Sequence, residues 1–330
     1  MNTSDNQPFP VADDRRHPPY RSARTLILTL CFMWSVFQLY VASVVPFVLT
    51  EWTGLSLVFN NQEVRQIHLA FAFALAMLAY PLNKQSPGAQ TPWYDYAAAM
   101  IAATSCLYLL VFKDQISDRA GLPTDSDLWI SAIGMLSLAL ALYRCLGLPL
   151  LIVCSCFLFY VFFGDQSFMP DTMQWKGASL NKALWHFWMQ TEGVFGVALG
   201  VASSMIFLFV LFGALLEKAG AGIYFIRLAY ALLGHLRGGP AKAAVVASGL
   251  SGIYSGSSIA NVVSTGTFTI PLMKKTGLTA EKAGAIEVAA STNGHLTPPV
   301  MGAAAFLIAE FTGISYLALI THAVLPAIVS

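Results

Sequence analysis

The sequence predicts an all-α polytopic membrane protein, in which transmembrane helices accompany a re-entrant helical hairpin and a discontinuous helix. Three observations predict this class. Hydrophobic residues make up 56% of the chain and charged residues 11%, and the mean hydropathy is +0.64, which excludes an ordinary soluble domain. Long uncharged windows recur along the chain. Two of the later apolar stretches are interrupted by runs of Ser, Gly, Asn and Pro, which a simple span would not carry.

The first 24 residues are polar and Pro-rich, and they end in an arginine cluster that includes Arg21 and Arg24. This segment lacks the apolar core of a cleavable signal peptide. We therefore expect residues 1–24 to be a disordered cytoplasmic tail. The stretch from Leu26 to Leu49 is predicted to be a retained membrane helix.

Uncharged windows predict six crossings before the hairpin. They lie between Arg24 and Glu51, Arg65 and Lys84, Asp95 and Lys113, Asp127 and Arg144, Arg144 and Asp165, and Glu192 and Glu217. With the N-terminus inside, thirteen Lys and Arg residues fall in inside segments and five in outside segments. The positive-inside rule favours this orientation. We expect a four-helix membrane region over residues 25–145, a connecting helix and periplasmic interfacial helix over 146–192, and a further domain over 193–330.

Two segments are predicted to lie along the membrane surface. Ser167 to Glu192 contains Trp175, Trp185 and Trp188, and its apolar residues recur at helical spacing. Because indole rings favour the membrane interface, we expect an amphipathic helix at the outer face. A shorter amphipathic helix from Ile223 to Leu233 is expected at the inner face.

The predicted hairpin spans residues 243–273, a run of 31 residues without a charge between Lys242 and Lys274. At about 1.5 Å per residue, one continuous helix of that length would overshoot a bilayer core of roughly 30 Å. Two glycines and four serines between Ser251 and Ser258 interrupt the run. Each arm alone is too short to cross, so we expect both to open on the cytoplasmic face. The alternative is a Ser/Gly-rich packing face between two ordinary membrane helices.

A second interruption follows within the predicted broken helix 279–309. Residues 291–299 carry a polar run that ends in Pro298 and Pro299, and each Pro removes a backbone donor and crowds the preceding turn. We expect the helix to resume from Val300 to Ala309 and a last helix to return over Ile314 to Val329. Paired discontinuous helices indicate a transporter binding site near the membrane midplane.

The candidate ligand-binding residues are the small polar residues and glycines of the two interruptions. They are Ser251, Gly252, Ser255, Gly256, Ser257, Ser258 and Asn261 in the hairpin, and Ser291, Thr292, Asn293, Gly294 and Thr297 in the broken helix. Hydroxyl and carbonyl oxygens suit a small cation, and close backbone approach suits the head of a carboxylate. The alternative is that these side chains bond back onto their own helices. Pro298 and Pro299 are predicted to act only by breaking the helix.

Two ionisable residues lie near the second interruption. His295 is either a proton or substrate contact or a hydrogen-bonded buried histidine. Glu287 lies within a predicted membrane segment, where an acid is a functional candidate by default, unless it faces a cytoplasmic vestibule.

Short motifs from Gly238 to Gly313 carry a family resemblance. They are Gly238-Gly239-Pro240, Gly256-Ser257-Ser258-x-Ala260, Pro271-x-Met273, the Gly277 turn and Ala290-Ser291-Thr292-x-Gly294-x-Leu296-x-Pro298-Pro299. Together they resemble the large, DctM-like permease subunit of tripartite ATP-independent periplasmic (TRAP) transporters. The preceding helices resemble the small four-helix subunit, fused in front as in TAXI-type permeases.

The resemblance implies Na⁺-driven uptake of organic acids, C4-dicarboxylates or related carboxylates, across the bacterial inner membrane. It implies a periplasmic solute-binding protein as partner, an elevator motion against a static small subunit, and no cofactor other than the coupling ion. It places Na⁺ at Gly256, Ser257, Ser258, Asn293 and Gly294. The family's permease has a second, inverted copy of the hairpin and broken helix. This chain contains one such half repeat, of the ion-transporter-superfamily type, so we expect a fragment or the first portion of a longer fusion.

Other functions remain as alternatives. A gated channel or proton-coupled exchanger could use the same broken helices, and a structural subunit is a further possibility. An enzyme is not expected, because no H-E-x-x-H or G-x-S-x-G motif lies in a membrane helix. The formal net charge of +1 and the lack of a basic patch exclude a nucleic-acid partner.

Overall fold

The structure, a computed structural model, describes residues 23–80, 82, 91–119, 121–167, 169–294, 296–298 and 301–329. Within these ranges the chain forms helices and no strand. It divides into two compact units, residues 1–200 and 201–330, which are described separately. Most of the predicted N-terminal tail lies outside the described residues, and the first helix begins at Arg24.

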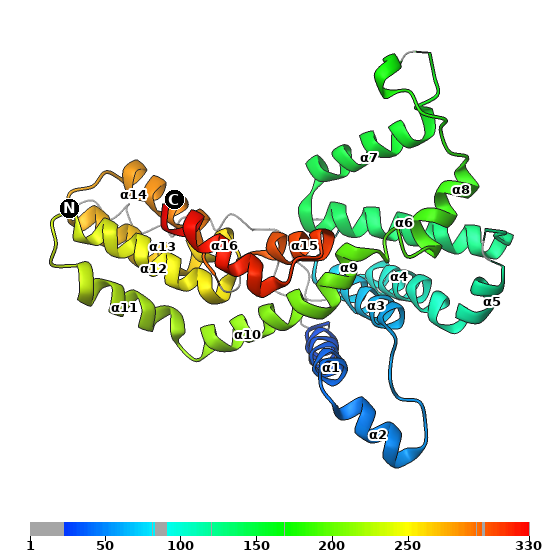
Figure 1. Ribbon diagram of the computed structural model, residues 1–330, viewed down its shortest axis with the longest axis horizontal. Helices are drawn as coiled ribbons and strands as arrows, with labels where there is room; N and C mark the ends of the chain where they lie inside the picture. The colour runs from blue at the N-terminus through cyan, green and yellow to red at the C-terminus, as the bar shows by residue number, and fades with distance from the viewer. Residues whose placement is uncertain are drawn as a thin grey trace. The chain divides into compact units, whose positions relative to one another are not determined.

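The first unit contains the helices that correspond to the early uncharged windows (Figure 1). They are α1 (Arg24–Ala42), α2 (Val45–Thr53), α3 (Asn61–Ala79), α4 (Trp93–Val111), α5 (Lys113–Asp118), α6 (Asp125–Leu146), α7 (Leu148–Phe163), α8 (Leu180–Leu184) and, at the boundary of the units, α9 (Val197–Val201). The helices α1, α4 and α6 and the helical run Val197–Lys218 are long and apolar enough to cross a membrane. The prediction of an all-α polytopic membrane protein is confirmed.

The first predicted span is not one helix. Ser43 takes an extended backbone conformation that ends α1, and Pro46 lies in the first turn of α2. Proline has no N–H to donate, so it is tolerated in a first turn but not in a helix interior. Residues 26–49 are therefore divided between two helices.

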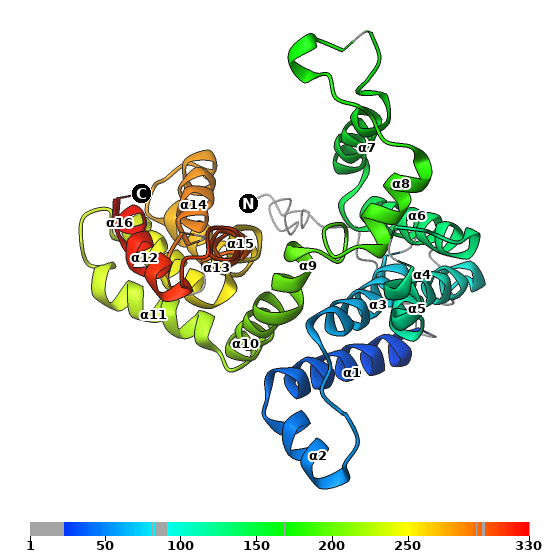
Figure 2. The same ribbon diagram turned by 45° about the vertical axis from the view of Figure 1, so that its right-hand side comes forward.

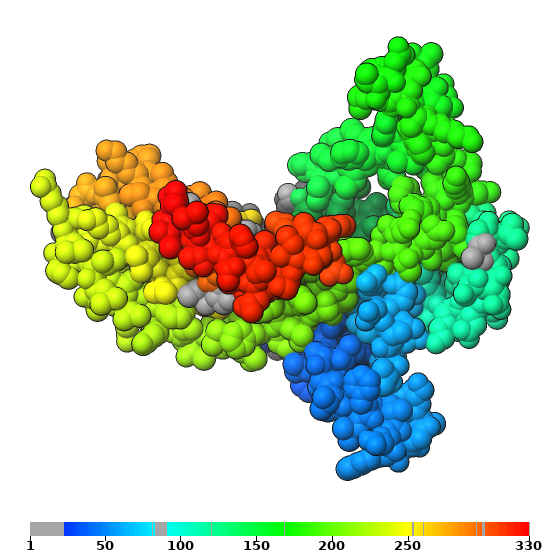
Figure 3. All heavy atoms as spheres, viewed as in Figure 1, coloured from blue at the N-terminus to red at the C-terminus, as the bar shows by residue number. Residues whose placement is uncertain are grey.

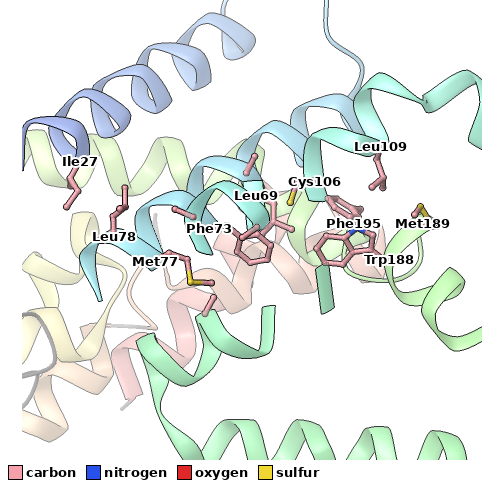
Figure 4. Close-up of a cluster of buried hydrophobic side chains, with 14 of the residues drawn as sticks. Ile27, Leu69, Phe73, Met77, Leu78, Cys106, Leu109, Trp188, Met189 and Phe195 are labelled. Carbon is pink, nitrogen blue, oxygen red and sulfur yellow. The ribbon is translucent and has the colours of Figure 1, made fainter. Parts of the chain in front are cut away.

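The core of the first unit is built around Trp188, which has no exposed surface. Its indole stacks on Phe73, with ring centroids 6.4 Å apart, and meets Phe195 edge-on at 5.2 Å (Figure 4). A Cβ at Gly134 of α6 would come within 2.1 Å of this indole. The ring therefore fills a space that a larger residue at position 134 would take.

The segment over residues 167–192, predicted as one amphipathic interfacial helix, does not form a single helix in its described part. The described part of this segment holds a 3₁₀ turn, Asp171–Met173, the short helix α8 and a π-helical turn, Trp185–Met189. Trp185 is 6% exposed and Trp188 fully buried. The apolar spacing did identify a buried face, but α6 and the core cover that face in place of lipid.

Three ion pairs tie the helix ends of this bundle together. Arg144 and Asp95 lie 2.7 Å apart with almost no exposed side-chain surface, and Arg144 also donates to the carbonyl oxygen of Met77 at 2.9 Å. At the opposite helix ends, Lys113 pairs with Glu63 at 2.7 Å. Arg119 pairs there with Asp127 at 2.9 Å.

The second unit contains the predicted hairpin and broken helix. After a π-helical turn, Ala202–Ile206, its helices are α10 (Phe207–Lys218), α11 (Ala221–Leu233), α12 (Gly239–Ser255), α13 (Ser258–Lys275), α14 (Ala280–Gly294), α15 (Ala303–Thr312) and α16 (Tyr316–Val329). Helices α11, α12 and α13 pack side by side, as both ribbon views show (Figures 1 and 2). The last two helices, drawn in red, lie on the near face of this unit in Figure 3.

Both interruptions begin later than predicted. The hairpin breaks only at Gly256 and Ser257, between the end of α12 and the start of α13, and Gly256 has a φ of 55°. Ser251, Gly252 and Ser255 stay helical. Similarly, α14 continues through Gly294. The next helix begins at Ala303 instead of Val300. Small residues at helix interfaces allow close packing within intact helices. Ser251, Gly252 and Ser255 therefore remain helical and do not interrupt α12.

Candidate functional site

The two arms of the hairpin pair in antiparallel fashion. Near the break, the side-chain nitrogen of Asn261 in α13 donates to the carbonyl oxygen of Ser248 in α12 at 2.9 Å and to its hydroxyl at 2.8 Å. Further from the break, Ala244 and Met273 belong to one buried cluster, which Ala283 of α14 completes. The predicted hairpin is therefore present, and the first turn of α14 packs at its open end.

Helix α14 runs along the hairpin, parallel to α12, and reaches the break with its last turn. A Cβ at Gly252 would lie 2.2 Å from the carbonyl oxygen of Gly294. A Cβ at Gly294 would lie 2.8 Å from the side-chain nitrogen of Asn261 and 2.9 Å from the carbonyl oxygen of Ser248. Only glycine fits at either position, and the two glycines bring three helices together at one point.

A buried column of polar side chains leads away from this point. Asn261, Thr265 and Thr269 repeat every four residues on α13, and Glu287 and Ser291 do so on α14. All five are at most 1% exposed. Residues four apart share one helix face, so both rows face the α13–α14 contact.

Glu287 is the centre of this column. One carboxylate oxygen accepts hydrogen bonds from the hydroxyls of Thr265 and, at 3.4 Å, Ser291. The other accepts from the hydroxyl of Thr269 at 2.5 Å. Ser291 also lies 3.1 Å from the hydroxyl of Ser248. Within the described part of the chain no Lys, Arg or His forms an ion pair with Glu287.

Three buried oxygen atoms near the break have no hydrogen-bond partner among the described residues. They are the side-chain amide oxygen of Asn261 and the hydroxyl oxygens of Ser251 and Ser255. A buried polar atom without a partner costs about 1–3 kcal/mol, so each such atom calls for an explanation such as a bound ion or water. All three are oxygens, which a hard cation such as Na⁺ prefers. The donor set at the break therefore fits the predicted ion.

The predicted site residues of the hairpin gather at this place. Ser251 and Gly252 are buried on the face of α12, and Gly256 forms the turn. Ser257 and Ser258 are half-buried, and the carbonyl oxygen of Ser257 accepts from the backbone N–H of Asn261 at 2.9 Å.

The predicted residues of the broken helix divide into two groups. Ser291 and Gly294 are buried against the hairpin. Thr292 is exposed and donates back to the carbonyl oxygen of Val288 at 2.8 Å, which is the alternative role considered for it. Asn293 donates to the carbonyl oxygen of Ala327 in α16 at 3.4 Å.

The break after α14 forms a local turn. The carbonyl oxygen of Asn293 accepts from the N–H of Leu296 at 2.9 Å and from the hydroxyl of Thr297 at 3.0 Å. Pro298 follows this turn, whereas His295 and Pro299 lie outside the described residues. The carbonyl oxygen of Asn293 thus already has protein donors.

Sequence reasoning missed three residues of the buried column: Ser248, Thr265 and Thr269. In the sequence, Asn261, Thr265 and Thr269 recur every four residues within an uncharged stretch. This spacing places them on one face of a helix, so a search for amphipathic helices would have found the polar face of α13. It also missed Tyr254, whose ring stacks on Phe225 at 6.1 Å beside the break.

Tyr254 also borders a cavity of about 210 Å³, which reaches from Glu217 to Ser264 and Thr265. Its backbone carbonyl oxygen would lie 2.3 Å from a Cβ at Gly213. The end of α12 is therefore fixed against α10, and the cavity touches one of the hydroxyl donors of Glu287.

Comparison with known proteins identifies the family. The profile of the "Tripartite ATP-independent periplasmic transporter, DctM component" matches residues 133–330. The C4-dicarboxylate TRAP transporter large permease protein DctM of Vibrio cholerae is 40% identical over 91 residues, which cover 28% of this chain and 20% of that protein. The DctM protein of Pseudomonas aeruginosa is also 40% identical over 91 residues.

A third relative is the uncharacterized protein YgiK of Salmonella typhimurium, which is 35% identical over 91 residues. The matched segment spans about a fifth of the length of these curated relatives. No solved structure matches the chain. Because the family profile covers more than half of its residues, the chain belongs to the DctM family of TRAP transporter large permeases.

Proposed function

We propose that this chain is the membrane permease, or part of the permease, of a Na⁺-coupled TRAP transporter in a bacterial inner membrane. Its substrates are organic acids, C4-dicarboxylates or related carboxylates, delivered by a periplasmic solute-binding protein. The N-terminus lies in the cytoplasm, and the chain carries out no covalent chemistry. Two relatives named as C4-dicarboxylate permeases support the substrate class. The helices that precede residue 133, where the match to the large-permease profile begins, act as the fused small subunit and static scaffold.

The observation that carries the proposal is the buried, unpartnered amide oxygen of Asn261 where α12, α13 and α14 meet. A cation bound there would be held by Asn261 and Ser255, with Ser257 and Ser258 at the rim of the break. The Gly252–Gly294 contact holds α12 against α14 beside Asn261. Bound Na⁺ would supply the positive charge that helps a carboxylate substrate to bind next to it.

Uptake into proteoliposomes, driven by a sodium gradient, tests this proposal. The complete permease, with this chain in its natural context, is reconstituted together with its binding protein and a radiolabelled C4-dicarboxylate. Uptake is expected only with an inward Na⁺ gradient and with the binding protein present. Equal uptake after replacement of Na⁺ by choline would contradict the proposal that Na⁺ is the coupling ion. Equal uptake without the binding protein would contradict the proposal that this protein delivers the substrate.

Glu287 supports a second candidate function, in which uptake is coupled to protons. A fully buried acid with three hydroxyl neighbours, and no cation paired with it in the described part of the chain, can hold a proton. The same liposomes distinguish the two coupling ions. An inward pH gradient that drives uptake in the absence of Na⁺ would establish proton coupling and overturn the sodium proposal.

A further inference from the structure

A separate cavity of about 510 Å³ lies in the first unit. Its walls come from the first turns of α3, the end of α4, helix α5, and the segment from Trp185 to Glu192. This volume falls within the range of about 300–1,000 Å³ that small-molecule sites occupy. The proposed transport function assigns no role to it.

The charged groups of the cavity come from three segments. Lys113 pairs with Glu63 at 2.7 Å across the wall, and the other carboxylate oxygen of Glu63 accepts from the N–H of Asn60 at 2.9 Å. Glu63 therefore has both oxygens engaged. Lys113 has three N–H donors, and half of its side chain is exposed. The hydrogen bond to Glu63 raises the pKa of Lys113, so the ammonium group stays charged at neutral pH.

The exposed Glu192 also lines the cavity. The lining thus carries one cation and two carboxylates, one of which Lys113 already neutralises. This balance disfavours a ligand with a net negative charge. It favours one that offers an anion to Lys113 and a cation to Glu192.

The position of the cavity along the helices indicates its surroundings. The apolar helix α4, long enough to span a membrane, ends at Val111, two residues before Lys113. The cavity therefore lies where an apolar span gives way to charged residues, which is the depth of lipid headgroups. Leu109, Ile116 and Met189 add an apolar part to its lining.

We propose that this cavity binds the headgroup of a zwitterionic phospholipid, phosphatidylethanolamine. The phosphate accepts a hydrogen bond from Lys113. The ammonium group donates to Glu192, and the glycerol end lies against Leu109 and Met189. An anionic lipid such as phosphatidylglycerol would bring a second unbalanced negative charge next to Glu192 and bind less well.

Native mass spectrometry of the purified protein tests the proposal. Protein exchanged into micelles with equal amounts of phosphatidylethanolamine and phosphatidylglycerol is expected to retain one molecule of the former. Lys113→Gln and Glu192→Gln should each reduce this retention by about tenfold. Lys176→Gln and Glu51→Gln, at exposed positions outside the cavity, are the matched controls and should retain it fully.

Three outcomes would overturn the proposal: no lipid retained by the wild type, equal retention of both lipids, or retention unchanged in both charge variants. Free O-phosphoethanolamine provides the last comparison. If it protects the wild type as well as the lipid does, the site takes a soluble zwitterion and the lipid assignment is wrong. None of these measurements depends on transport, so they stand or fall independently of the proposed function.

Discussion

Gly252 and Gly294 lie in backbone contact, so close that a Cβ at Gly252 would come within 2.2 Å of the carbonyl oxygen of Gly294. Forty-two positions separate them in the chain. One lies in an arm of the hairpin and the other in the last turn before the broken segment. Their contact defines where the candidate ion site is, because it holds Asn261 between two helices.

Gly252→Ala is expected to destabilise the second unit by about 1–3 kcal/mol, since the added methyl group must push α12 and α14 apart. Transport should fall with it. The measurement is the midpoint of thermal unfolding in detergent, together with uptake. Gly284→Ala on α14 is the matched control, because nothing lies within 4 Å of its Cβ position. That control should be neutral or stabilising by up to about 1 kcal/mol.

Asn261→Ala is expected to raise the Na⁺ concentration for half-maximal uptake by at least about tenfold, because it removes an uncommitted oxygen and the bridge to Ser248. Sodium titration of uptake checks this. Thr267→Ala serves as control, since Thr267 is exposed on the same helix and its hydroxyl donates to the carbonyl oxygen of Ser264. An unchanged sodium response in Asn261→Ala would remove Asn261 from the ion site.

Ser257→Ala combined with Ser258→Ala should weaken the sodium dependence of uptake more than it lowers expression. The hydroxyls at the break are predicted ion contacts, while α13 keeps its backbone bond from Asn261 to Ser257. Expression level and sodium titration are measured in parallel. A double variant with normal sodium activation would mean that the break acts through its backbone alone.

Gly256→Val is expected to abolish transport, because a β-branched residue at a φ of 55° is strained by about 1–2 kcal/mol or more. Gly256→Asn should retain part of the activity, since Asn tolerates the left-handed conformation better than other residues with side chains. Equal activity in the two variants would show that the conformation of this turn does not limit transport.

Asp95→Ala should destabilise the first unit by about 3–5 kcal/mol, because it leaves the buried guanidinium of Arg144 without its partner. Lys113→Ala should cost much less, since its side chain is 51% exposed and water screens the pair. Chemical denaturation of the two variants compares them directly. Similar losses would mean that burial does not determine the strength of these ion pairs.

The sequence was sufficient to predict the helices and the hairpin, because both follow from hydropathy and charge placement. The uncharged window from Asp95 to Lys113 holds α4, and Lys242 and Lys274 flank the hairpin that forms. The length of the breaks could not be predicted. Ser251 and Gly252 resemble helix breakers in isolation, but the close approach of α14 keeps them helical.

The burial of Trp188 in the protein core could not be predicted from the sequence for a similar reason. Its spacing shows that it lies on an apolar face, but not whether lipid or protein covers that face. Gly134 of α6 provides the space that the indole occupies. Likewise, Glu287 was identifiable as an unusual acid, whereas its hydroxyl partners come from a different helix and required the fold.

The ion pairs at the helix ends of the first unit limit how its helices can slide. A shift of α4 along α6 by one turn, about 5.4 Å, would pull Asp95 away from Arg144 at one rim. At the other rim the Lys113–Glu63 pair sets the register between α3 and the residues that follow α4. Because ion pairs hold both ends of this bundle, its helices resist sliding past one another. Its amide protons should therefore exchange with solvent as one cooperative unit. The bundle should also keep its internal structure when other parts of the protein move.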